Sequence, residues 1–351
     1  MYQRNSRRCG ALMLAVSVCL RICMFLGLDA RAAAYLTNAA KSTEFARWML
    51  FLETGQAVEV VETPPQSHLW VLEVEQPPQP EVVEVPIHVE VDEPLQTVPA
   101  DRISVAGGCT YTFDKAALLA RPSAIPADPT VLIVHTHGSE AYTPEPGLEY
   151  VSEGNYRTLD TERSVIRVGD ALAETLENRG ITVIHDRSLN DYPSYNDSYW
   201  TTLQKIEQWK AQYPEIQVVI DLHRDAVADD TGKAVALSAE AGGERVARLM
   251  LVVGTDQGGL SHPNWQENLA NALKLQSVLE AQHPGLCRNL DLRTERFNQH
   301  MTPGSILVEV GTNGNTLTQA IRSAELLGES LADLLQKLSS NAGTLDFPPD
   351  T

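Results

Sequence analysis

The sequence is poor in the features that define several protein classes. Its 351 residues hold 27 Lys and Arg against 46 Asp and Glu, which gives a formal charge of −19 and a pI near 4.8. This shortage of positive charge argues against a nucleic-acid partner. Five scattered cysteines are too few for a disulfide scaffold. The chain also has no P-loop and no dinucleotide-binding fingerprint, and Ser139 lacks the nucleophile-elbow context of a serine hydrolase.

Charge is distributed unevenly along the chain. Residues 1–31 hold five arginines and one acid, whereas residues 56–100 hold nine acids, eight prolines and no Lys or Arg. The latter composition cannot bury enough apolar surface to fold alone and predicts an extended spacer. We therefore divide the chain into a membrane anchor or signal segment (1–31), an amphipathic connector (32–55), an acidic Pro-rich linker (56–104), a catalytic domain (105–342) and a C-terminal tail (343–351).

Residues 1–31 predict that the rest of the chain is exported from the cytoplasm. As a helix, Ala11–Leu28 would be about 27 Å long, close to the hydrocarbon thickness of a bilayer. Arg21 interrupts the run, but it lies off-centre, where a long side chain can reach the interface. Positive charge before the run keeps that end in the cytoplasm. The alternative is a cleaved signal peptide with an A-x-A site at residues 30–32. Both interpretations place the catalytic domain outside the cytoplasm.

The body alternates predicted strands with predicted helices. Buried apolar runs predict strands at 131–134, 182–184, 217–222, 246–253 and 305–310. Helical periodicity predicts helices at 162–179, from 196 onward, at 264–282 and at 315–338, the first of them capped by Asp160 and Thr161. This order predicts an α/β fold with a mainly parallel or mixed sheet flanked by helices. Chemistry in such sheets lies beyond the carboxyl ends of the strands.

His and Glu side chains follow two of these strands. His135, His137 and Glu140 follow the first strand, and His223 follows the third. Zinc hydrolases use three N or O ligands and leave one position open, and two His with one Glu is a known set. A lone His at a strand end is more often a hydrogen-bonded loop residue, so the prediction depends on the conjunction. His137 has the better spacing to Glu140, which predicts His137, Glu140 and His223 as Zn²⁺ ligands and leaves His135 as a supporting or substrate-binding group.

A further polar residue, Glu309, lies in the late strand where Val or Leu would be expected. A carboxylate there could take the proton of the attacking water and pass it to the leaving nitrogen. Asp221 and Asp225 could orient His223 through its other ring nitrogen.

Two further features leave alternatives open. Arg224 is either an oxyanion or substrate-carboxylate contact, or a structural ion-pair partner of Asp225 or Glu140. Asn298 and Gln299 precede the late strand and either line a cleft or form a turn.

The segments VLIVHTHGSEAYTP, VVIDLHRDA and NQHMTPGSILVEVGTNGNTLTQA resemble the stage II sporulation protein P family, over roughly residues 125–338. The resemblance implies an amidase-like fold similar to zinc carboxypeptidases and a zinc N-acetylmuramoyl-L-alanine amidase. Such an enzyme cuts the amide between N-acetylmuramic acid and the stem peptide of peptidoglycan, and it is also credited with cleaving peptide cross-links.

The resemblance also implies a place of action and partners. These are forespore engulfment, in the space between the mother-cell and forespore membranes, with the companion sporulation proteins D and M. On the matching positions, His137, Glu140 and His223 would hold zinc and Glu309 would be the catalytic carboxylate. The alternatives are another zinc peptidase of carboxypeptidase-like type and a non-catalytic wall-binding module, which a complete ligand set disfavours.

Overall fold

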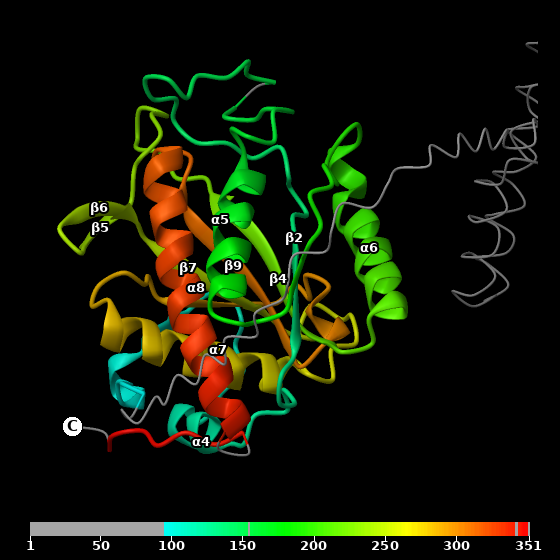
Figure 1. Ribbon diagram of the computed structural model, residues 1–351, viewed down its shortest axis with the longest axis vertical. Helices are drawn as coiled ribbons and strands as arrows, with labels where there is room; N and C mark the ends of the chain where they lie inside the picture. Colours follow the sequence, from blue (N-terminus) through cyan, green and yellow to red (C-terminus); the bar gives the residue numbers. More distant parts are fainter. Residues whose placement is uncertain (1–94, 154, 341–342, 350–351) are drawn as a thin grey trace, which may run out of the picture. The chain divides into compact units, whose positions relative to one another are not determined.

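The computed structural model describes residues 95–153, 155–340 and 343–349, which belong to one unit spanning residues 88–351 (Figure 1). The predicted anchor, the connector and most of the acidic linker lie outside the described residues. Within the described ranges, no helix is both long and apolar enough to cross a membrane.

A mixed seven-stranded sheet forms the centre of the fold, with strand order β1-β8-β7-β9-β4-β2-β3. All neighbouring strands are parallel except β7 and β9, which are antiparallel. This architecture confirms the predicted α/β class. The strands are β1 (Val105–Ala106), β2 (Thr130–Val134), β3 (Val183–His185), β4 (Ile216–Asp225), β7 (Leu249–Gly254), β8 (Leu290–Arg293) and β9 (Gly304–Thr312).

The two faces of the sheet are covered unequally. Three long helices, α5 (Val165–Asn178), α7 (Trp265–Gln282) and α8 (Leu317–Ser340), cover one face and contact one another through α8 (Figure 1). The other face packs against α6 (Ser198–Gln212) over β2 and β4. Because side chains alternate along a strand, Val131 and Ile133 enter the larger core whereas Leu132 and Val134 pack against α6. Short elements complete the fold: α4 (Lys115–Ala120), η1 (Ala100–Arg102), η2 (Tyr195–Asp197) and η3 (Gln299–Met301).

The first long helix begins later than predicted. The Oγ of Ser164 accepts a hydrogen bond from the Ile166 N–H and caps α5, so the predicted caps Asp160 and Thr161 are wrong. The Asp160 side chain instead accepts from the Glu162 N–H in the preceding turn. Ser164, three residues after Thr161, therefore sets the start of α5.

The predicted strand at 246–253 is two strands in different sheets. Residues 244–247 form β6, which pairs with β5 (Ser238–Ala241), and β7 of the main sheet starts at Leu249. The Gly242–Gly243 turn between β5 and β6 has positive φ at both residues, which suits a tight hairpin. Apolar residues stand on both sides of Arg248 because Val246 and Ala247 are buried in the hairpin just as Leu249 is buried in the sheet.

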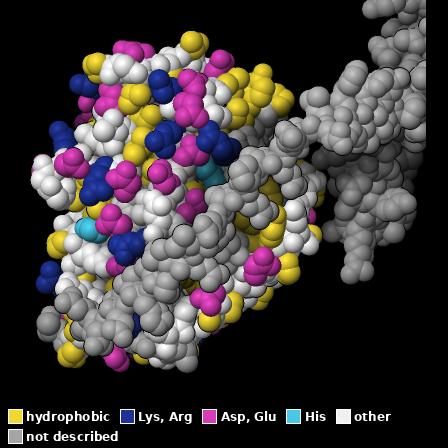
Figure 2. All heavy atoms as spheres, viewed as in Figure 1, with side chains coloured by type: hydrophobic (Ala, Val, Ile, Leu, Met, Phe, Trp, Pro, Cys, Tyr) yellow, Lys and Arg dark blue, Asp and Glu magenta, His cyan; other side chains and the backbone are white. Residues whose placement is uncertain are grey.

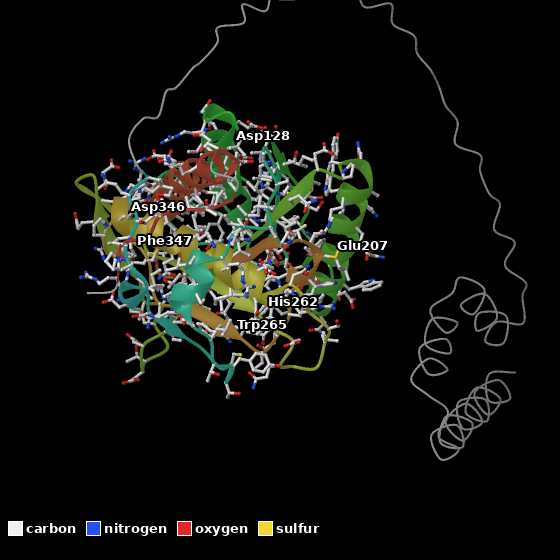
Figure 3. All side chains as sticks on the ribbon, turned by 90° about the horizontal axis from the view of Figure 1, so that it is seen from below. Asp128, Glu207, His262, Trp265, Asp346 and Phe347 are labelled. Atoms are coloured by element: carbon white, nitrogen blue, oxygen red, sulfur yellow. The ribbon has the colours of Figure 1, made fainter. Side chains whose placement is uncertain are left out.

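Both ends of the catalytic unit differ from the predicted boundaries. Leu95 and Val98 pack on the core and Ile103 is fully buried, so the last part of the predicted linker belongs to the folded unit. Leu345 and Phe347 of the predicted tail also pack against the core. Figure 3 labels Phe347 beside Asp346, whose carbonyl accepts a hydrogen bond from Thr97 Oγ1. On the face drawn in Figure 2, basic and acidic side chains are interspersed.

Candidate metal and catalytic site

The site residues of β4 and β9 point to the less covered face of the sheet. His223 of β4 lies in register with Glu309 of β9, and Asp221 with Leu307. Leu307 packs on this face with Met250. Because residues i and i+2 share a face, Asp221, His223 and Glu309 lie on the α6 side of the sheet. His223 therefore lies within a longer β4 than predicted, on the face of the sheet as well as near the strand end.

The turn after β2 brings His137 and Glu140 to the same place. The Oε2 atom of Glu140 lies 3.4 Å from His223 Nδ1, and it accepts the Arg224 backbone N–H at 3.1 Å. The rings of His137 and His223 meet edge to face with centroids 5.2 Å apart. All three side chains are buried. The structure thus brings together the three residues that the sequence selected as ligands.

His135 lies away from this cluster. Its Nδ1 is 3.0 Å from the Leu222 carbonyl oxygen and its Nε2 is 2.8 Å from His185 Nε2. Gly169 of α5 packs on this pair, because a Cβ at that position would come within 2.6 Å of both Nε2 atoms. The predicted supporting or substrate-binding role of His135 is therefore wrong; it anchors α5 to the sheet.

Of the two aspartates expected to orient His223, only Asp221 contacts it. Asp221 Oδ1 lies 2.9 Å from His223 Nε2, an ion-pair distance whose angle is poor for a hydrogen bond. Its carboxylate is fixed by the N–H and hydroxyl of Thr136, at 2.8 and 2.6 Å. Asp225 instead pairs with Arg288 at 2.7 Å, so the orienting role predicted for it is wrong.

The Arg224 side chain donates its hydrogen bonds to backbone carbonyls. Its Nε donates to the Ala141 carbonyl at 2.8 Å, and its Nη2 donates to the carbonyls of Asn155 and Tyr156. With these bonds the guanidinium holds three backbone carbonyls. Neither the predicted oxyanion contact nor the predicted ion pair with Asp225 or Glu140 is present among these contacts. Arg224 holds the loop that carries Glu140.

Asn298 and Gln299 have different roles. Gln299 accepts from the Gly254 N–H and donates to the Val252 carbonyl, so it closes the end of β7 and does not line a cleft. Asn298 does line a cavity, and its Nδ2 donates to the Tyr199 carbonyl at 2.8 Å.

Four residues near the cluster were not predicted. Arg157 pairs with Asp191 at 2.7 Å and with Glu140 at 3.4 Å. The Tyr195 ring stacks on His137 with centroids 4.5 Å apart, and Arg157 covers Tyr195 at 4.8 Å. The Tyr199 ring meets His137 edge-on at 5.6 Å. The one sequence signal was an aromatic cluster, with four aromatic residues between positions 192 and 200 in a chain that is 6% aromatic.

The surroundings shift the pKa values of Glu309 and Glu140 in opposite directions. Burial raises the pKa of Glu309 to about 8, and the neighbouring Glu140 carboxylate adds to this rise. Burial also acts to raise the pKa of Glu140, but the hydrogen bond and charge of His223 outweigh it and lower the pKa to about 2. The surroundings thus favour the charged form of Glu140 and the neutral form of Glu309, so the two carboxyls differ in their readiness to carry a proton.

The cluster offers donor atoms of the kinds that a zinc ion takes. Within the described ranges, no three His, Cys, Asp or Glu side chains are already arranged as a metal site. However, His137 Nδ1 is buried without a hydrogen-bond partner, as is Glu309 Oε2. Two ligands about 2.0–2.1 Å from a tetrahedral zinc lie about 3.3–3.4 Å apart, and Glu140 Oε2 and His223 Nδ1 are 3.4 Å apart. The set is chemically that of a zinc hydrolase, two imidazoles and one carboxylate.

Comparison with known families shows to which family this chain belongs. The model of the family described as stage II sporulation protein P matches residues 73–332. The chain belongs to this family. The match spans β1 to most of α8 and therefore contains every residue of the cluster. A search of curated proteins found no match.

Solved structures that are similar to this chain share little sequence identity with it. N-acetylmuramoyl-L-alanine amidase AmiC2 of Nostoc punctiforme is 14% identical, with a TM-score of 0.37 over 62% of this chain and 99% of its own. Ami1 from Mycobacterium smegmatis is 11% identical, with a TM-score of 0.37 over 60% and 98%. The CwlD amidase from Clostridioides difficile, solved in complex with the GerS lipoprotein, is 14% identical, with a TM-score of 0.33 over 60% and 98%.

Proposed function

We propose that this protein is a zinc-dependent peptidoglycan hydrolase that cleaves the amide between N-acetylmuramic acid and the L-alanine of the stem peptide. The observation that carries the proposal is the carboxyl of Glu309, which lies in register with His223 and has its Oε2 atom buried without any hydrogen-bond partner. A carboxyl kept in this state beside two histidines and a second carboxylate suits proton transfer during amide hydrolysis. Membership of the sporulation family supports the choice of substrate.

In the proposed reaction, His137, Glu140 and His223 hold the metal. Bound zinc would lower the pKa of its water to about 7 and polarise the amide carbonyl. Asp221 fixes the orientation of the His223 ring through Nε2, which leaves Nδ1 toward Glu140. Glu309 takes a proton at Oε2 and returns it to the nitrogen of the leaving stem peptide.

Tyr199, whose ring lies against His137, would donate a hydrogen bond to the scissile carbonyl. Burial raises the pKa of its phenol, and the carboxylates of Asp221 and Glu309 raise it further. The hydroxyl therefore stays protonated and can donate a hydrogen bond at neutral pH.

The biological setting is part of the same proposal and follows from the family. We propose that Ala11–Leu28 anchors the chain and that the hydrolase works between the mother-cell and forespore membranes during engulfment. In this setting it acts with sporulation proteins D and M. Cleavage of peptide cross-links is a second activity of the same site.

The direct test measures zinc and peptide release together. The purified full chain should bind zinc and release stem peptide from isolated peptidoglycan, and chelation should stop release reversibly. His137→Ala should lose both zinc and activity, whereas the matched variant His135→Gln should keep bound zinc. Equal zinc in His137→Ala and the wild type would refute the ligand assignment, and intact peptidoglycan with the zinc-loaded wild type would refute the hydrolase.

A further inference from the structure

A second feature of the α6 side of the sheet is a cavity of about 380 Å³ beside the metal cluster. Its walls come from the start of α6, the loop after β7 and the loop after β8. The lining residues are Tyr199, Gly258, Leu260, Thr294, Glu295, Arg296, Phe297 and Asn298. None of the four cluster residues lines it. It is therefore a separate space, within the size range of small-ligand sites.

Tyr199 is the wall that the cavity shares with the cluster. One side of its ring contacts His137, and its ring also lies 5.9 Å from that of Phe297. Only the Tyr199 ring would therefore lie between His137 and a molecule that fills this side of the cavity. This separation suits a substrate whose reacting bond lies at the cluster and whose remainder extends into the cavity.

The cavity walls are fixed in a strained conformation. Phe297 and Asn298 are consecutive non-glycine residues with φ of 50° and 61°, a region that costs free energy for L-residues. The Asn298 side chain ties this loop to the Tyr199 carbonyl, and the Gly258 N–H donates to the Thr294 carbonyl at 2.8 Å. The two loops and α6 are thus joined by hydrogen bonds, so the cavity is preformed.

Two opposite charges lie in the lining without pairing. Among the described residues, neither Glu295 nor Arg296 takes part in an ion pair. Arg296 donates from Nη1 to the Ser261 carbonyl at 3.2 Å, while its Nε is buried with no hydrogen-bond partner. Glu295 is exposed. The remaining lining is apolar at Leu260 and Phe297 and polar at Thr294.

From these observations we propose that the cavity binds a short peptide that carries both a free carboxylate and a free amino group, with Arg296 taking the carboxylate and Glu295 the amine. The inference rests on the proposed function, in which this peptide is the stem on the leaving side of the amide. A guanidinium pairs with a carboxylate through two parallel hydrogen bonds. Neutral sugar rings offer no charge to either group, so the peptide fits the lining better than the glycan does.

Equilibrium binding tests the cavity without catalysis. The probes are a synthetic stem tripeptide with free carboxylates and the same peptide with every carboxylate amidated, titrated into the full chain. The wild type should bind the free form at least tenfold more tightly. Arg296→Gln should abolish this preference, Arg296→Lys should restore part of it, and Glu295→Gln should weaken binding of both probes. The matched control is Arg179→Gln, whose side chain pairs with Asp333 outside the cavity and should bind like the wild type.

Kinetics on peptidoglycan separate this inference from the function on which it rests. Arg296→Gln should raise KM about tenfold and change kcat little, because the lost contact exists before and during the reaction. A cleaving wild type with unchanged KM and unchanged probe preference in a folded Arg296→Gln would overturn the peptide cavity and leave the hydrolase intact. A wild type that binds the tripeptide through Arg296 but cleaves nothing would overturn the hydrolase alone. Far-ultraviolet circular dichroism checks that each variant is folded.

Discussion

His223 of β4 and Glu309 of β9 lie side by side in the sheet, a matched pair in register on adjacent parallel strands. Backbone hydrogen bonding of the sheet therefore fixes the spacing between a metal-ligand candidate and the proton-transfer carboxyl. A site built on strands holds its geometry more closely than one built on loops.

Glu309→Gln should keep the fold and the bound zinc but lower kcat by about 10²–10⁴-fold, the usual contribution of a positioned acid–base group. The amide fills the same space yet cannot exchange a proton. Initial rates of stem-peptide release, with zinc content measured in the same preparation, check this. Glu325→Gln, which changes an α8 carboxylate paired with Arg322, is the control and should behave as the wild type. Full activity in Glu309→Gln would remove Glu309 from the mechanism.

Asp221→Asn should weaken zinc binding by about 10–100-fold, because a carboxylate behind a ligating histidine fixes its ring and raises its basicity. Asp225→Asn is the matched control from the same strand; since Asp225 pairs with Arg288, its loss should leave zinc affinity unchanged. Competition with a chromophoric chelator measures both. Equal affinities for the two variants would show that Asp221 does not support His223.

Arg224→Lys should destabilise the protein by about 2–3 kcal/mol, because lysine cannot serve the three carbonyls that the guanidinium serves. Urea denaturation gives the change in the free energy of unfolding. Well below the unfolding midpoint, kcat/KM per folded molecule should stay close to that of the wild type. A large fall in kcat with unchanged stability would return Arg224 to the catalytic group.

Asp186→Asn should destabilise the protein in a pH-dependent way. Burial acts to raise the pKa of Asp186, but hydrogen bonds from Ser188 and from Trp209 Nε1, the latter at 2.6 Å, outweigh burial and lower the pKa. A carboxyl with a lowered folded-state pKa stabilises the protein above its unfolded pKa of about 3.9, and this stabilisation is lost as pH falls through the folded value.

The cost of Asp186→Asn should therefore be about 1–2 kcal/mol at pH 7 and should shrink once the pH falls below about 4. Urea denaturation at a series of pH values measures it. Glu207→Gln is the control, because Glu207 is an exposed carboxylate on the same helix as Trp209 (Figure 3). A cost that does not vary with pH would mean that the charge of Asp186 is not involved.

The sequence predicted the parts of the site that have a local pattern. His137 and Glu140 are three residues apart after a buried strand, and Glu309 interrupts an apolar run, so each could be recognised along the chain. The α/β class was predictable for the same reason, since apolar periodicity reports burial. The split of the 246–253 segment between two sheets was not, because burial in a hairpin and burial in a sheet leave the same apolar run.

The roles of Arg224, Asp225 and His135 were not predictable from spacing. Each lies within two residues of a cluster member, but its partners are distant in sequence: the Asn155 and Tyr156 carbonyls for Arg224, Arg288 for Asp225, and His185 for His135. Arg224 is next to His223 on the strand and so points to the opposite face. The strand register shifts between His223 and Asp225, and the chain leaves β2 before His135, so the alternation of faces does not extend to these two residues. Tyr199 reaches His137 only because α6 packs across the sheet.

The central claim is the bond that is cut, and mass spectrometry of the products from purified peptidoglycan tests it most directly. The zinc-loaded full chain should release intact stem peptides with a free L-alanine amino group and leave glycan strands whose N-acetylmuramic acid carries a free carboxyl. Glu309→Gln should release almost none. Products that keep L-alanine on the sugar throughout, or equal release by Glu309→Gln, would contradict the account.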